Sequence, residues 1–94
     1  MIIRIVKMTF HPENVEVFKG LFEGVKDKIT NFDGCQKVML LKDTLNPSIF
    51  FTYSIWESTA KLNAYRKSAF FDETWHKTKA LFSDKPEAWS LEEP

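Results

Sequence analysis

Hydrophobic positions along the chain form short strand-like runs and one helix-like stripe. Three apolar runs are rich in β-branched and large side chains, which is typical of strands: residues 2 to 10, 36 to 43 and 49 to 56. Between the first two runs, apolar residues recur at steps of three and four, which indicates an amphipathic helix with one buried stripe. The members of this stripe are Val15, Phe18, Leu21, Phe22, Val25 and Ile29.

Turn residues mark the ends of these segments. Pro12 fits the first turn of the helix, where its missing N–H costs nothing. Asp33-Gly34 ends the helical segment with a residue that tolerates positive φ. The stretch TLNPS contains Asn46-Pro47, a turn signal, and forms a loop between the second and third strands.

The C-terminal half predicts a second helical region and a fourth strand. Ser58 can cap a helix that we expect to break near Ser68 and resume to Phe82. The stretch AWSL then forms a last short strand. The resulting order, β-α-β-β-α-β, defines an α+β, ferredoxin-like fold in which two helices lie on one face of an antiparallel sheet.

Both faces of this predicted sheet are apolar. A sheet covered by helices on one side should alternate apolar and polar residues, but residues 38 to 41 are consecutively apolar and the other two strands carry large apolar side chains on both parities. Two helices cover only one face. The simplest cover for the other face is the same sheet of a second copy, so the pattern predicts a homodimer.

Size, charge and cysteine content narrow the class of protein. The 94 residues suffice for one domain, residues 1–94, and 13 basic residues balance 13 acidic ones, which leaves no cationic excess for nucleic acid. The single cysteine, Cys35, excludes an intrachain disulfide, and no closely spaced Cys and His set suggests a metal site. Arg4 and Lys7 interrupt the apolar N-terminus, which is too short for a signal peptide or a membrane span. We expect a cytoplasmic protein with no membrane or nucleic-acid partner.

The chain resembles a known family in nearly its whole length. The features that carry the resemblance are the order of elements, the loop at Asn46-Pro47, the corner Trp56-Glu57-Ser58, and the run Ala60, Leu62, Tyr65, Ser68 and Phe71. They resemble the antibiotic biosynthesis monooxygenase family of dimeric α/β-barrel proteins. The resemblance implies a homodimeric barrel with a cavity in each subunit between sheet and helices. Family members include cofactor-free oxygenases of quinol-type aromatics, haem-degrading enzymes and small-molecule-binding proteins.

The chain departs from the family pattern at several positions. Tyr65 stands where many members have His in Leu-x-x-His-x-x-Ser, and Ser54 stands where many have Glu. The haem-degrading branch uses an Asn, a Trp and a His that align with Val6, Tyr65 and Trp75. His76 is one residue away from the last of these, and one step turns a helical side chain by about 100°. We therefore do not expect haem degradation.

Two residues are candidates for catalysis. Tyr65 shares a helix face with Leu62 and Ala69, so its ring is expected to point inward. Its hydroxyl could then hydrogen-bond a phenol or quinol oxygen, although a purely structural place in the core explains the residue equally well. His76 could be a general base because an ordinary imidazole titrates near neutrality, and a solvent-facing helical His is the alternative.

The candidate substrate-binding residues are an arginine and four aromatics: Arg4, Tyr53, Trp56, Phe70 and Trp75. Trp56 either packs the corner between strand and helix or forms a cavity wall that stacks on an aromatic ligand. Arg4 would steer an anionic substrate if the even-numbered side chains of the first strand face the cavity. The sequence leaves open which side chains do so.

The resemblance implies a cofactor-independent monooxygenase that acts on a small aromatic, quinol-type substrate. A dihydroxy aromatic can reduce oxygen itself once deprotonated, so the protein supplies a dry cavity, a group that shares the phenolic proton, and hydrogen bonds to the developing oxyanion. No flavin, haem or metal motif is visible, and we expect none to be needed. Two alternatives stay open: a non-catalytic small-molecule-binding or stress-response protein, and a structural dimerisation module with a collapsed pocket.

Overall fold

The computed structural model describes all 94 residues, with four strands and three α-helices in the predicted order. A single 3₁₀ turn, Pro12–Asn14, leads into the first helix, so Pro12 does begin a helical turn. The elements are β1 (Ile2–Thr9), α1 (Val15–Thr30), β2 (Cys35–Lys42), β3 (Ile49–Trp56), α2 (Thr59–Arg66), α3 (Ala69–Lys79) and β4 (Glu87–Leu91).

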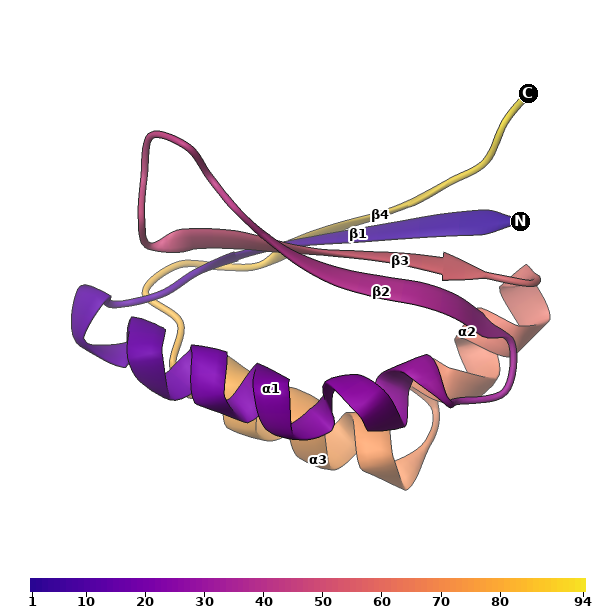
Figure 1. The fold of residues 1–94 in the computed structure, drawn as a ribbon, viewed down its shortest axis with the longest axis horizontal. Helices are drawn as coiled ribbons and strands as arrows, with labels where there is room; N and C mark the ends of the chain where they lie inside the picture. The colour runs from indigo at the N-terminus through magenta and orange to yellow at the C-terminus, as the bar shows by residue number, and fades with distance from the viewer.

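The four strands form one antiparallel sheet in the order β2-β3-β1-β4. All three helices lie on the same face of this sheet, where α1 and α3 pack against each other (Figure 1). This is the α+β, ferredoxin-like arrangement predicted from the order of elements. None of the helices combines the length and the apolar character that crossing a bilayer requires.

Serine caps explain where the two C-terminal helices begin. The Ser58 hydroxyl accepts a hydrogen bond from the Lys61 backbone N–H at 3.2 Å and starts α2. The Ser68 hydroxyl accepts one from the Phe71 N–H at 3.1 Å and starts α3. A helix N-terminus leaves N–H groups without partners, and a serine hydroxyl satisfies one of them. The predicted break near Ser68 is therefore confirmed.

The end of α3 differs from the prediction. The helix ends at Lys79, three residues before the predicted Phe82. Phe82 has left the helix and forms an isolated antiparallel bridge with Phe10. Their rings lie 5.4 Å apart between centroids, so tertiary packing of two aromatics outweighs continuation of the helix.

Gly34 lies in the turn between α1 and β2. Its φ of 89° is the only positive φ in the chain, and a Cβ there would collide with the Lys61 side chain. Both observations require glycine. The helix cap itself is Asn31, so Gly34 shapes the entry to β2 rather than the last turn of the helix.

The strand register decides which residues face the helices. Arg4, Val6 and Met8 of β1 point toward the helices, and their β3 partners are Ser54, Thr52 and Phe50. Side chains alternate across a strand, so the odd-numbered residues of β1 and β3 occupy the opposite face. The buried core lies entirely on the helix side and consists of Met8, Phe10, Phe18, Phe22, Ile29, Val38, Phe50, Trp56 and Leu62.

The opposite face of the sheet, called the outer face below, has no helix over it (Figure 1). The register places one row of four apolar residues across its middle: Met39, Tyr53, Ile5 and Trp89. Trp89 is 42% exposed and Leu91 is 47% exposed. Neighbouring side chains leave Ile5, Met39 and Tyr53 partly exposed, and no helix or strand covers the row.

Candidate functional site

A pocket of about 310 Å³ lies between the sheet and the helices. Residues from all four strands and all three helices contribute to its lining, although Ala88 is the only residue of β4. Most of the lining is apolar or aromatic, with a few polar side chains among them. Ligand sites in proteins have this character, and the volume is at their lower end.

Aromatic rings form one wall of the pocket. The ring of Tyr65 stacks on Trp56 with centroids 4.7 Å apart and an interplanar angle of 26°. The edge of Phe71 meets Tyr65 at 5.1 Å, and Trp75 stacks on Phe71 at 6.0 Å. Trp56 is only 1% exposed, so it is at once a core residue and a pocket wall. Trp56 thus packs the corner between strand and helix and also borders the pocket, while its stacking on an aromatic ligand stays a prediction.

Ser54 fixes the orientation of Trp56. The Trp56 indole Nε1–H donates to the Ser54 Oγ at 2.9 Å, and the Ser54 hydroxyl lies 3.5 Å from the Arg4 carbonyl oxygen, to which it donates. The indole N–H is therefore already bonded and not free for a ligand. The sequence marks Ser54 only as a departure from the family pattern; the two-residue spacing that puts Ser54 and Trp56 on one face of β3 is the signal that could have found this hydrogen bond.

Tyr65 lies in the pocket lining and is largely buried. Burial raises the pKa of its hydroxyl far above the ordinary value, and the nearby Cys35 adds to the rise. No other residue of the chain forms a hydrogen bond with this hydroxyl. At neutral pH Tyr65 is therefore a neutral phenol that can donate a hydrogen bond but cannot serve as a resting general base.

Both Arg4 and Arg66 line the pocket. Arg4 is half-buried, and its Nη1 donates to the Ser90 hydroxyl at 2.9 Å. Burial lowers the pKa of Arg4, and the positive charge of Arg66 lowers it further. Arg66 follows Tyr65 at the end of α2 and is exposed. The hydrophobic pattern does not single out Arg66; its one signal is that it is the only arginine besides Arg4.

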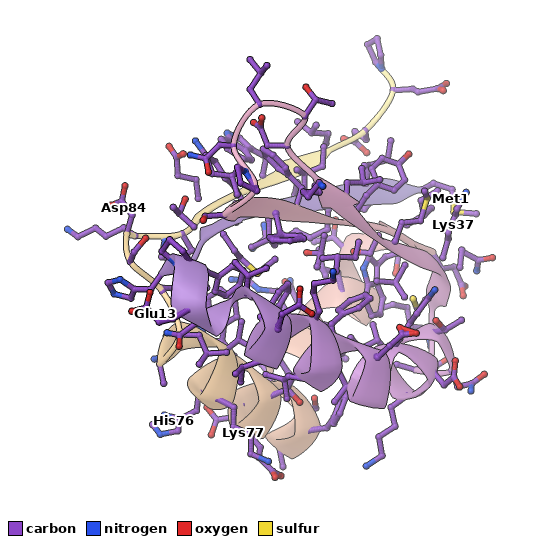
Figure 2. All side chains as sticks on the ribbon, turned by 60° about the vertical axis from the view of Figure 1, so that its left-hand side comes forward. Met1, Glu13, Lys37, His76, Lys77 and Asp84 are labelled. Carbon is purple, nitrogen blue, oxygen red and sulfur yellow. The ribbon has the colours of Figure 1, made fainter.

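Of the seven candidate residues, four line the pocket: Arg4, Trp56, Tyr65 and Trp75. His76 does not. It is exposed and points away from the sheet on the far side of α3 (Figure 2). Since Trp75 points inward, the turn of about 100° per residue carries His76 out to solvent.

Tyr53 and Phe70 also lie outside the pocket. Tyr53 pairs with Ile5 and belongs to the outer face, because its parity is opposite to that of Thr52 and Ser54. Phe70 packs against Tyr65 at 6.4 Å, with the Lys28 ammonium 5.2 Å from its ring centroid. It borders a shallower groove between α1 and α3.

No carboxylate, imidazole, thiol or lysine lines the pocket, so its ionisable groups are Arg4, Arg66 and Tyr65. Hydroxyls of Thr52, Ser54, Thr74 and Thr78 supply further polar atoms. Nowhere in the chain do three or more His, Cys, Asp or Glu side chains lie close enough together to hold a metal ion. The charge in the pocket is thus positive only, and its other polar groups are hydroxyls, of which those of Ser54 and Thr78 already donate to backbone carbonyls.

Comparisons with known proteins agree with this architecture. The family model described as antibiotic biosynthesis monooxygenase matches residues 1–77. A solved structure named antibiotic biosynthesis monooxygenase superposes with a TM-score of 0.92 at 17% identity, over 100% of this chain and 99% of that one. No match was found among curated proteins.

Two further solved structures have the same fold. A conserved protein from Methanosarcina mazei Go1 gives a TM-score of 0.92 at 21% identity, over 100% of this chain and 94% of that one. Rv0793 from Mycobacterium tuberculosis gives 0.89 at 14% identity, over 99% and 94%. At these identities the likeness concerns the fold, and the pocket has to be interpreted from its own residues.

Proposed function

The chain belongs to the antibiotic biosynthesis monooxygenase family, and on that premise we propose that it is a cofactor-independent monooxygenase of a small, quinol-type aromatic. The observation that carries the proposal is the pocket between sheet and helices, in which a stacked aromatic wall meets hydroxyl and guanidinium donors. An aromatic ring fits between such walls, and donors suit the oxygen atoms of a quinol.

The chemistry needs no redox group on the protein, because the substrate supplies the electrons. A quinol loses a phenolic proton, and the resulting phenolate transfers electrons to O₂ as a ring carbon forms a bond to oxygen. The O–O bond of the peroxide then breaks, and one oxygen leaves as water. In sum, a quinol and O₂ give a hydroxyquinone and water, so the ring is oxidised and oxygen is reduced.

The pocket residues assist by charge and hydrogen bonding. Positive charge from Arg4 and Arg66 favours the phenolate over the phenol, which lowers the pKa of the bound substrate. Tyr65, kept neutral by burial, donates a hydrogen bond to the developing oxyanion. Because no carboxylate or imidazole lines the pocket, the proton leaves to water.

The test is oxygen consumption by the purified protein with a panel of quinols and polyhydroxylated aromatics, against a heat-denatured control. We expect saturable uptake with one substrate class. Tyr65→Phe, which removes one donor to the oxyanion, should lower kcat by about tenfold or more. Tyr53→Phe is the matched control, since it removes the same hydroxyl from the outer face and should leave uptake unchanged. Uptake no faster than the control across the panel would overturn the proposal.

A second candidate is a non-catalytic small-molecule-binding protein of the same fold. The absence of a general base from the pocket lining favours it, because an enzyme that abstracts a phenolic proton commonly positions one. The same panel separates the two functions. Saturable binding of quinols without oxygen uptake would support the binding protein and exclude the monooxygenase.

We further propose that the protein is a homodimer in the cytoplasm, with two outer faces packed together. The support is the uncovered apolar row Met39, Tyr53, Ile5 and Trp89. A two-fold axis would place each row against its copy and bury it. The lone cysteine forms no disulfide, which suits a reducing compartment.

A further inference from the structure

The distribution of basic residues in this chain is uneven in one respect. Lys and Arg together number 13, yet only Arg4 and Arg66 are arginines, and both line the same pocket. No lysine lines it. Arginine differs from lysine in presenting a planar fork of N–H donors that matches two oxygens at once. The placement of both arginines therefore points to recognition of a planar anion.

Neither arginine has a partner of opposite charge within the chain. The four ion pairs of the protein all use lysines: Lys7–Glu87, Lys19–Glu16, Lys61–Asp33 and Lys77–Glu73. The only hydrogen bond from a guanidinium to another residue is the one from Arg4 to the neutral Ser90 hydroxyl. Since the chain has no net charge, carboxylates are available elsewhere but are absent from this pocket.

Both arginines border the same pocket, so the charge of one acts on the other. Burial lowers the pKa of Arg4, and the charge of Arg66 contributes to the same change. Two like charges in one partly buried place repel each other, and a bound anion would relieve the repulsion. Arg66 is exposed, so this part of the pocket reaches the surface, while Trp56 and Tyr65 line its aromatic wall.

We propose that Arg4 and Arg66 bind the carboxylate of a small aromatic acid whose ring lies against the aromatic wall of the pocket. A carboxylate is planar and has two oxygens, which suits the guanidinium fork. An aromatic system of one or two fused rings suits a pocket volume of about 310 Å³. This inference rests on the proposed function only in placing the ligand in this pocket, and it names the anionic group of the substrate class.

The experiment compares 2-naphthoate with 2-naphthamide, two probes of nearly equal shape that differ in charge and do not react with oxygen as quinols do. Binding is followed by calorimetry or by quenching of tryptophan fluorescence. Charge-assisted hydrogen bonds are stronger than neutral ones, so we expect naphthoate to bind about tenfold more tightly or better. The preference should weaken as salt is added, because Arg66 is exposed.

The variants are Arg4→Gln, Arg66→Gln and the double variant, with Lys67→Gln as the matched control. Lys67 follows Arg66 and carries the same charge, but it does not line the pocket. We expect each arginine variant to reduce the preference, Arg4→Gln more strongly because Arg4 is the more buried, and the double variant to abolish it. Arg4→Lys should keep part of the preference for naphthoate that Arg4→Gln loses, which would show that the loss comes from the missing charge and not from misfolding.

Several results would overturn the inference. These are equal binding of naphthoate and naphthamide, a preference that survives in the double variant, and failure of both probes to bind. Tighter binding of 2-naphthyl phosphate than of the carboxylate would overturn the assignment of the anion. Oxygen uptake is judged separately. Naphthoate preference without uptake would reject the monooxygenase alone, whereas uptake of neutral quinols without any preference for acids would reject this inference alone.

Discussion

The two faces of the sheet consist of alternate residues of the same strands, yet they differ in almost every other respect. The inner face packs against three helices and contains the buried core, including Trp56 at 1% exposure. The outer face carries a comparable tryptophan, Trp89, at 42% exposure. Its apolar middle row has no cover at all (Figure 1).

The difference shows how one hydrophobic pattern can serve two purposes. On the inner face, apolar residues pack against other parts of the same chain and leave a pocket whose polar groups are guanidiniums and hydroxyls. On the outer face, equally apolar residues such as Ile5 have neighbours in adjacent strands but no helix packed over them. Exposed apolar patches of this kind commonly mark interaction surfaces. The inner face therefore holds the buried core and the pocket, and our proposal of a homodimer assigns association to the outer face.

The largest expected effect tests the stability of the inner face. Trp56→Ala removes a ring that is fully buried and stacked on Tyr65, and should lower the free energy of unfolding by about 3–5 kcal/mol in urea titrations. Trp89→Ala, the matched change on the outer face, should destabilise a single chain much less because Trp89 is already 42% exposed there, so both variants are compared in the Ile5→Glu background, which is expected to be monomeric. An equal loss in the two variants would contradict the contrast between the faces.

The next effect concerns association. Ile5→Glu places a charge in the middle of the outer row, and an unpaired charge in a buried interface costs about 3–5 kcal/mol. We expect sedimentation or light scattering to give twice 11.0 kDa for the wild type and 11.0 kDa for this variant. Val17→Glu, on an exposed helix position, is the control and should stay dimeric. A wild-type monomer at micromolar concentration would refute the homodimer.

A smaller effect is the response of stability to alkaline pH. Burial raises the pKa of Tyr65, so above about pH 10 the unfolded chain loses this proton while the folded chain retains it. The free energy of unfolding should then fall by about 1.4 kcal/mol per pH unit from this group.

Tyr65→Phe isolates this contribution, because every other ionisable group of the chain is the same in both proteins. The difference in unfolding free energy between wild type and variant should be constant below about pH 10 and change above it. A constant difference up to pH 12 would mean that the hydroxyl is not desolvated.

The smallest expected effect is that of His76→Ala. The imidazole is exposed and points away from the pocket, so oxygen uptake and stability should both stay within experimental error of the wild type (Figure 2). Trp75→Ala, one residue earlier, removes a pocket wall and should affect both. A loss of uptake in His76→Ala alone would require a second copy or another conformation to bring this residue to the substrate.

The fold was largely predictable because its signals are local. The period of apolar residues predicted α1. Ser58 and Ser68 indicated the starts of α2 and α3, because serine hydroxyls cap helix N-termini. The end of α3 was not predictable from such signals. Phe82 leaves the helical path to pair with Phe10, which is distant in sequence, and helix propensity contains no information about that contact.

The candidate site was predictable only in part, for the same reason. Trp56 and Tyr65 were recognisable as large aromatics at or just after the corner between strand and helix, and Trp75 as a large aromatic of the later helical segment; all three line the pocket. Side chains alternate between the two faces of a strand, and Arg4 lines the pocket whereas Tyr53 does not because the helices cover the face on which Arg4 lies. The Ser54–Trp56 hydrogen bond was not predicted, although the two residues are two apart in one strand and therefore share a face.

The sequence by itself thus determined the order of elements, the helix caps and the presence of two apolar sheet faces, because these follow from spacing and from side chains acting on their own backbone. Only the tertiary structure decided which face received the helices, that His76 lies in solvent, and that Arg4 and Arg66 meet in one pocket. Arg4 and Arg66 are separated by most of the chain. Their proximity results from packing α2 against the sheet, a long-range arrangement that no local pattern specifies.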